Sequence, residues 1–234
     1  MRNTEKKTFL QNRFSESYSI SNFLTDDQVA DLISFYNHLP NEEKIFKNSG
    51  PITANIHNSD RAKDIFAMLK EKVIAEIGPC EIYNAAFFDV SYPHIIHNDD
   101  LKSLPDTYKA FTLPLEVRGS NIPSFITYNQ HYLDGPVKLF KGEEKEITSY
   151  YNDIVSDYTS VIGLTSEEFP KDVWAKCLTH IKPVWLEGLS VEKIHKWQPG
   201  NAIVFDCARL HSACDFRHQG VKSKLGLSIF TYTQ

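Results

Sequence analysis

The chain has 234 residues, of which 41% are hydrophobic and 24% are charged, and its formal net charge is −5. This length and composition are typical of a water-soluble domain with one substantial core. The acidic balance argues against a dedicated nucleic-acid surface, and no stretch approaches the ~20 apolar residues of a membrane span. The polar start and the four cysteines, none in a Cys-x-x-Cys pair, lead us to expect a cytoplasmic protein with reduced thiols.

The first third of the sequence indicates a polar arm followed by two helices. Residues 1–16 are polar, and residues 17–23 are a short strand candidate. Residues 25–28 read Thr-Asp-Asp-Gln, a capping box, and apolar residues at helical spacing follow until Pro40. A second amphipathic helix is predicted within residues 59–78. Two such helices need a surface to cover, and a sheet is the natural one.

From residue 80 onward the sequence has the texture of β-strands, rich in aromatic and β-branched residues. Pro114 falls inside a predicted strand and indicates either an edge strand or a bulge. The charged, tyrosine-rich segment of about 134–182 is predicted to be an insertion with a helix near 171–180. Helices first and strands afterwards predict an α+β chain that is mainly β at its centre. The predicted strands span 81–90, 109–117, 124–132, 191–197, 202–205 and 224–232, with further strand-like texture at 184–186.

A histidine and a carboxylate stand two residues apart at His97 and Asp99. On an extended strand, residues i and i+2 point to the same side, so the two side chains converge on one point. Two ligands hold a divalent ion poorly, and His211, just past the apolar strand 202–205, is the best candidate for a third. Two histidines and one carboxylate leave other coordination positions open, which suits non-heme Fe(II).

Two neighbours of this motif need separate interpretations. Asp100 is the alternative carboxylate, but on a regular strand it points away from His97, so we favour Asp99. His94 has no carboxylate two positions later. We expect it to be structural, or to contact a metal ligand without binding the metal itself.

The last predicted strand carries lysines at Lys222 and Lys224, on one face with Gly226 and Ser228. A cation on the inner face of a mostly apolar strand is costly unless an anion answers it, either a protein carboxylate or a ligand. The alternative is that these lysines lie at the solvated beginning of the strand.

The combination of His97-x-Asp99, then His211 after a Pro-Gly-x-Ala-Ile-Val-Phe strand, then Lys224 on a terminal strand resembles the Fe(II)- and 2-oxoglutarate-dependent oxygenase family. The resemblance covers roughly residues 80–232. It implies a double-stranded β-helix, also called a jelly roll and shared with cupins, with N-terminal helices supporting one sheet. We therefore expect a single oxygenase domain over residues 1–234. Its parts are an arm and supporting helices at 1–79 and a jelly-roll core at 80–234 with the insertion at about 134–182.

The resemblance also implies an activity. Fe(II) would be held by His97, Asp99 and His211, and 2-oxoglutarate by Lys224 or, with less support, by Lys222. With O2, such an enzyme would hydroxylate an unactivated C–H bond of a small amino acid-like metabolite or a peptide side chain and release succinate and CO2. In the resembled family, inserts at the place of 134–182 often cover the substrate entrance. We expect substrate contacts there, among Tyr150, Tyr151, Tyr158 and Trp174.

Two positions carry further information within this resemblance. Halogenating relatives have a small residue where Asp99 stands, so Asp99 favours hydroxylation, desaturation or ring closure. The family commonly has Ser or Thr two residues after the basic residue, whereas this chain has Gly226. Thr112, Tyr83 and Tyr92 are the candidates for the missing hydroxyl.

Three other interpretations remain open at this level. The chain is alternatively a non-catalytic jelly-roll binding module, or a cupin-like metal oxygenase that does not use 2-oxoglutarate, and Lys224 argues against the latter. Cys207 and Cys214 flank His211 and suit zinc in type, but a fourth ligand is not evident. The plainer interpretation is that these cysteines are small buried hydrophobes.

Overall fold

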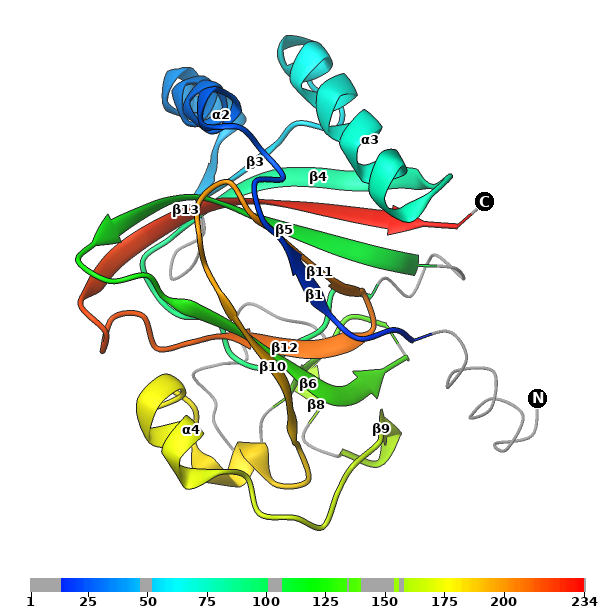
Figure 1. Cartoon of the computed structure of the whole chain (residues 1–234), viewed down its shortest axis with the longest axis vertical. Helices are drawn as coiled ribbons and strands as arrows, with labels where there is room; N and C mark the ends of the chain where they lie inside the picture. Colours follow the sequence, from blue (N-terminus) through cyan, green and yellow to red (C-terminus); the bar gives the residue numbers. More distant parts are fainter. Residues whose placement is uncertain are drawn as a thin grey trace.

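The computed structural model describes residues 14–46, 52–100, 107–133, 135–139, 154–155 and 158–233. A seven-stranded antiparallel sheet runs in the order β1-β11-β5-β13-β4-β3-β2, and a smaller sheet runs β10-β6-β12 with β9 paired to β6. The two sheets form successive layers, with helices outside each of them (Figure 1). The strands are β1 Tyr18–Ile20, β2 Ile45–Phe46, β3 Ile52–Asn55, β4 Glu81–Val90, β5 Thr107–Gly119, β6 Ser124–Tyr132, β7 Lys138–Leu139, β8 Ile154–Val155, β9 Val161–Ile162, β10 Val191–Lys196, β11 Ala202–Asp206, β12 Arg209–Ala213 and β13 Val221–Tyr232.

Helices α2 (Asp26–His38) and α3 (Lys63–Ile77) cover the outer face of the seven-stranded sheet (Figure 1). The predicted capping box starts α2, because Thr25 and Gln28 each accept a hydrogen bond from the other's backbone N–H. The buried side chains of Leu32 and Leu69 pack with the outer face of the sheet in one apolar cluster. The remaining helical elements are α4 (Lys171–Cys177) and the short 3₁₀ turns η1 Asn41–Glu43, η2 Asp60–Ala62, η3 Tyr158–Ser160 and η4 Pro183–Leu186.

Strand β13 lies between β4 and β5 and pairs with both along most of its length. Leu225, Leu227 and Ile229 point into the apolar cluster beneath the helices. Because successive side chains alternate between faces, Lys224 and Ser228 point the other way, into the space between the two sheets. The sequence alternation of this strand therefore places a lysine in the interior.

Three local predictions need correction. Pro114 marks a bulge, as expected, because Leu225 pairs with Glu116 while Gly226 pairs with Pro114. The edge-strand interpretation was wrong, since β5 lies inside the sheet between β11 and β13. The strand-like segment 184–186 is instead the 3₁₀ turn η4, which begins at a proline that suits a helical first turn. Helix α4 ends at Cys177, three residues earlier than predicted.

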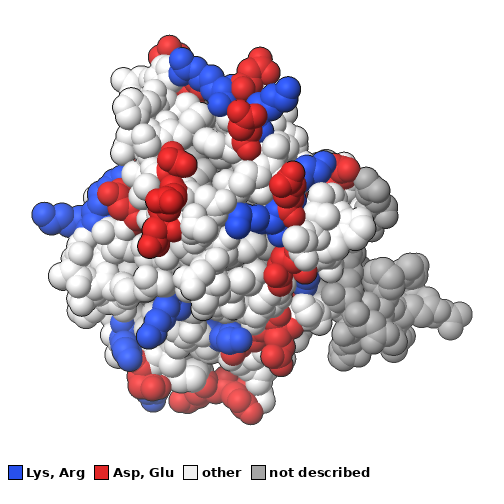
Figure 2. Space-filling view, turned by 45° about the horizontal axis from the view of Figure 1, so that its top comes forward, with Lys and Arg blue, Asp and Glu red and all other residues white. Residues whose placement is uncertain are grey.

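Acidic and basic side chains are interspersed over the face shown in Figure 2. None of the helices in the described part of the chain has the length and apolar character that a membrane crossing requires. The insertion predicted at about 134–182 lies partly outside the described residues. Tyr150 and Tyr151 are in the part that is not described.

Candidate functional site

The segment that carries His97 and Asp99 lies outside the named strands, and it is hydrogen-bonded to β12 and to the turn before it through an isolated antiparallel bridge. His97 and His211 exchange both backbone hydrogen bonds, at 2.9 and 2.8 Å, and the Asp99 N–H donates to the Cys207 carbonyl at 2.9 Å. Strand β12 in turn pairs with β6, where His211 faces Thr127. Residues far apart in the sequence are thus held in register by backbone bonds, and the extended geometry assumed for His97-x-Asp99 is present.

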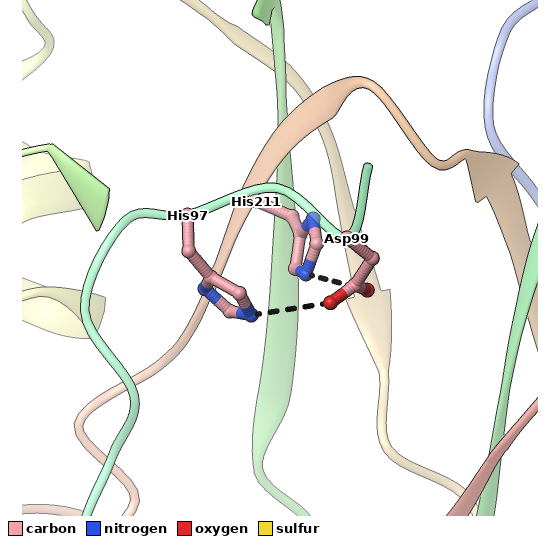
Figure 3. Close-up of side chains that lie close together, drawn as sticks. All are labelled: His97, Asp99 and His211. Carbon is pink, nitrogen blue, oxygen red and sulfur yellow. Dashed lines mark ion pairs between the residues drawn. The ribbon is translucent and has the colours of Figure 1, made fainter. Parts of the chain in front are cut away.

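The three side chains converge as the sequence predicted (Figure 3). Nε2 of His211 lies 3.3 Å from one oxygen of Asp99, and Nε2 of His97 lies 3.9 Å from the other. One ligand atom from each residue lies within 4.8 Å of the others. Adjacent donor atoms on one octahedrally coordinated ion are roughly 3 Å apart, so a divalent ion fits between these atoms after small side-chain adjustments. Their role as metal ligands stays a prediction.

Backbone carbonyls fix the tautomers of the two rings, and they direct Nε2 of His211 at Asp99 and Nε2 of His97 at both Asp99 and His94. Nδ1 of His211 lies 3.0 Å from the Arg209 carbonyl, and Nδ1 of His97 lies 2.8 Å from the Ile95 carbonyl. A carbonyl only accepts, so each Nδ1 carries the proton and each Nε2 keeps its lone pair. This fixes the tautomer and the ring orientation, as in known metal sites.

Charge at the cluster also matches a cation site. Burial, and then the neighbouring His94 and His211, lowers the pKa of His97 well below its ordinary value. Burial alone would raise the pKa of Asp99, but His211 and then His97 outweigh it, so this pKa is lowered. Neutral imidazole and ionised carboxylate are the forms that bind metals.

His94 lies directly against this cluster. Its Nδ1 is 3.0 Å from Nε2 of His97, and its other ring nitrogen contacts the ammonium of Lys138 on β7. His94 therefore contacts the candidate ligand atom of His97, and its ring would have to release that nitrogen for a metal to bind there, although it is outside the group of three that converges. Asp100, the alternative carboxylate, instead accepts a hydrogen bond from Thr107.

A cavity of about 360 Å³ opens between the two sheets at this cluster. Its walls include His97, Asp99, His211 and Lys224, so the lysine and the candidate metal ligands face one space. The remaining lining is largely aromatic and apolar, with a few polar side chains, and includes Thr53, Asn84, Phe88, Tyr92, Thr112, Phe125, Trp197, Ser228 and Phe230.

Lys224 is 3% exposed, whereas Lys222 is exposed to solvent. Its ammonium lies 3.6 Å from the centroid of the Trp197 ring and 5.3 Å from that of Phe216. Within the described residues it forms no hydrogen bond and no ion pair. Burial lowers the pKa of Lys224 from 10.5 to about 8. A buried cation without a protein anion is the arrangement expected where a ligand supplies the anion.

The three candidates for the missing hydroxyl lie in different places in the structure. Thr112 and Tyr92 line the cavity, whereas the Tyr83 hydroxyl donates to the Asp99 carbonyl at 3.3 Å. Tyr158 and Trp174 of the insertion are not among the lining residues and donate to backbone carbonyls of the same region.

Two further outcomes concern residues near His211 and in the cavity wall. Cys207 and Cys214 are buried, and neither belongs to the converging group, so the zinc interpretation has no support among the described residues. Trp197 was predicted only as the end of a strand. Nothing in the sequence around Trp197 indicated that it would line the cavity. The only related feature was a glycine at position 226, which leaves room for the indole.

No protein-family model and no curated protein matches this sequence. Solved structures do match. An oxidoreductase of the 2OG-Fe(II) oxygenase family from Burkholderia pseudomallei has a TM-score of 0.53 at 12% identity, covering 99% of this chain and 91% of that one. The epimerase SnoN, in complex with Fe3+, alpha ketoglutarate and nogalamycin RO, has a TM-score of 0.51 at 14% identity, with 98% and 83% covered. A Pseudomonas putida prolyl-4-hydroxylase has a TM-score of 0.50 at 11% identity, with 94% and 93% covered. The chain thus has the double-stranded β-helix fold of these proteins, and the predicted fold class is confirmed.

Proposed function

We propose that this chain is a non-heme Fe(II)- and 2-oxoglutarate-dependent oxygenase. One observation carries the proposal: a cluster of two histidines and one carboxylate shares a single cavity with a buried lysine that has no anionic partner among the described residues. The cluster alone suits several divalent ions. The lysine adds a requirement for an anionic ligand in the same space. The shared fold with 2-oxoglutarate-dependent enzymes supports the same conclusion.

The geometry supports the following roles for the residues. His97, Asp99 and His211 would hold Fe(II), and Lys224 would pair with the distal carboxylate of 2-oxoglutarate. When bound, the iron and this cosubstrate supply the activation of O2, with succinate and CO2 as products. The chain fixes both imidazole tautomers through the Arg209 and Ile95 carbonyls. Aromatic side chains form much of the wall around the candidate reacting centre.

The proposed reaction is hydroxylation of an unactivated C–H bond in a small amino acid-like metabolite or a peptide side chain. Asp99 would occupy a coordination position that halogenation requires to be free. A cavity of about 360 Å³ is at the small end of ligand sites, so with the cosubstrate inside it admits a small molecule or the end of a longer one. Asn84 and Thr53 are polar groups of the wall that suit an amino acid-like substrate. The SnoN structure contains a small molecule, nogalamycin RO, and this is compatible with a metabolite as the substrate.

The test is anaerobic addition of Fe(II) and 2-oxoglutarate to the purified chain. We expect a weak visible charge-transfer band from the metal–cosubstrate complex, weakened in Lys224→Ala. No band in the wild type contradicts the proposal and leaves a binding module. A band of wild-type strength in Lys224→Ala removes Lys224 from the site. Succinate release against a panel of metabolites and peptides then identifies the substrate class.

A further inference from the structure

Trp197 carries a buried hydrogen-bond donor that finds no acceptor in the part of the chain that the structure describes. The residue is 1% exposed and follows β10, where its backbone N–H donates to the Pro123 carbonyl at 2.8 Å. Its indole Nε1 is buried and has no hydrogen-bond partner among the described residues. Buried indole N–H groups usually find an acceptor, because leaving one unpaired is costly. The exception therefore suggests that a ligand supplies the acceptor.

The position of this donor is set by Gly226. A Cβ atom at Gly226 would lie 2.8 Å from Cζ2 of Trp197, closer than packed atoms approach. Cζ2 and Nε1 are both bonded to Cε2, so they form the same edge of the indole. The N–H edge therefore lies beside the backbone of β13, two residues after Lys224 and on the same face of the strand.

The same indole also contacts the buried ammonium. Nζ of Lys224 lies 3.6 Å from the ring centroid, which is within the range of a cation–π interaction. Both side chains line the cavity that contains His97, Asp99 and His211. A cation and an unpaired N–H donor, side by side in an apolar wall, are the two components of a carboxylate site.

We propose that Trp197 is a second anion-binding residue of this cavity, whose indole N–H donates to the carboxylate that Lys224 pairs with. The identity of that carboxylate, the distal group of 2-oxoglutarate, rests on the proposed function. The ring face holds the ammonium in the ligand-free chain. An entering carboxylate draws the ammonium off the ring and accepts from both groups. Gly226 admits the indole edge, so the donor comes from the end of β10 and not from a hydroxyl on β13.

The first test observes the N–H group directly. The sequence has three tryptophans, so ¹⁵N labelling of tryptophan gives three indole signals. In the full chain loaded with Zn(II), 2-oxoglutarate should move the Trp197 signal downfield. 2-Oxovalerate, which has the same carbon chain without the far carboxylate, should leave it in place. The Trp174 indole already donates to the Ile181 carbonyl and serves as an internal control. The signals are assigned with Trp174→Phe and Trp185→Phe variants, so the test does not depend on a substitution at Trp197.

The second test measures affinity by calorimetry on the same metal-loaded protein. Trp197→Phe keeps a ring and removes the donor, and we expect its Kd for 2-oxoglutarate to rise about tenfold or more. Its Kd for 2-oxovalerate should stay within about twofold, and Trp174→Phe should behave as wild type for both ligands. An unmoved Trp197 signal, with equal affinities in Trp197→Phe and wild type, overturns this inference and leaves the proposed function intact. A wild type that does not bind 2-oxoglutarate at all overturns the proposed function.

Discussion

The ammonium of Lys224 lies 3.6 Å from the centroid of the Trp197 ring, in the interior between two sheets, and no carboxylate of the described residues pairs with it. An aromatic face compensates a desolvated charge only in part. The arrangement is therefore unfavourable for the empty protein and favourable for a bound anion. Stability and ligand binding should respond in opposite directions to changes at this residue.

Replacing Lys224 with methionine should stabilise the ligand-free chain and abolish its binding of 2-oxoglutarate. Because burial lowers the pKa of Lys224 from 10.5 to about 8, the buried charge costs about 3 kcal/mol of unfolding free energy below pH 8. Denaturant unfolding at pH 7 measures the gain. The gain should shrink as pH rises from 8 towards 10.5, where the folded wild type has lost the proton and the unfolded chain still holds it. Lys222→Met, at an exposed position, is the matched control and should change neither property. A less stable Lys224→Met protein would contradict this account of the site.

The affinity for 2-oxoglutarate should depend on pH through the same group. The carboxylate pairs with the charged lysine, which predominates below a pKa of about 8 in the empty site. Affinity should therefore be level below pH 8 and fall by up to about tenfold per pH unit above it. Lys224→Arg stays charged throughout this range, so its profile should remain flat. Calorimetric titrations from pH 6.5 to 9.5 separate the two curves, and parallel declines would assign the dependence to another group.

The register of the metal cluster can be tested with two adjacent carboxylates. Asp99 lies 3.3 Å from Nε2 of His211, whereas Asp100 accepts a hydrogen bond from Thr107. Asp99→Asn should weaken Fe(II) binding at least tenfold, because an amide is a poorer ligand than a carboxylate. Asp100→Asn should retain binding even if its stability falls. Anaerobic thermal melts report the difference, since an ion at 100 times its Kd adds about 2.7 kcal/mol to wild-type stability. The reverse ranking of the two variants would place the ligand at Asp100.

The convergence of His97, Asp99 and His211 was predictable because it depends on strand geometry. His97 and Asp99 share a side only when the segment is extended, and its hydrogen bonds to His211 and Cys207 make it so. The buried lysine followed from alternation along β13. The Trp197 donor was not predictable. Its position depends on the space left by the missing Cβ of Gly226, and the two residues meet only in the folded chain. Because Gly226 has no hydroxyl, we expected Thr112, Tyr83 or Tyr92 to supply one. The 3₁₀ turn at 183–186 was predicted as a strand, because three consecutive apolar residues are compatible with a buried turn as well as with a strand.

Gly226→Ala tests whether the empty space at this position is required. The added Cβ would lie 2.6 Å from Cζ of Phe88 and 2.8 Å from Cζ2 of Trp197, so both rings must move. Overpacking of this kind costs about 1–3 kcal/mol, which outweighs the roughly 0.4–1 kcal/mol that Gly→Ala gains through the unfolded chain. We expect lower stability and, because the indole edge shifts, weaker binding of 2-oxoglutarate. Ser228→Ala, two residues further along the same face, is the matched control and should leave stability within about 0.5 kcal/mol. If Gly226→Ala binds 2-oxoglutarate as tightly as wild type, the position of the indole edge is not what determines the affinity.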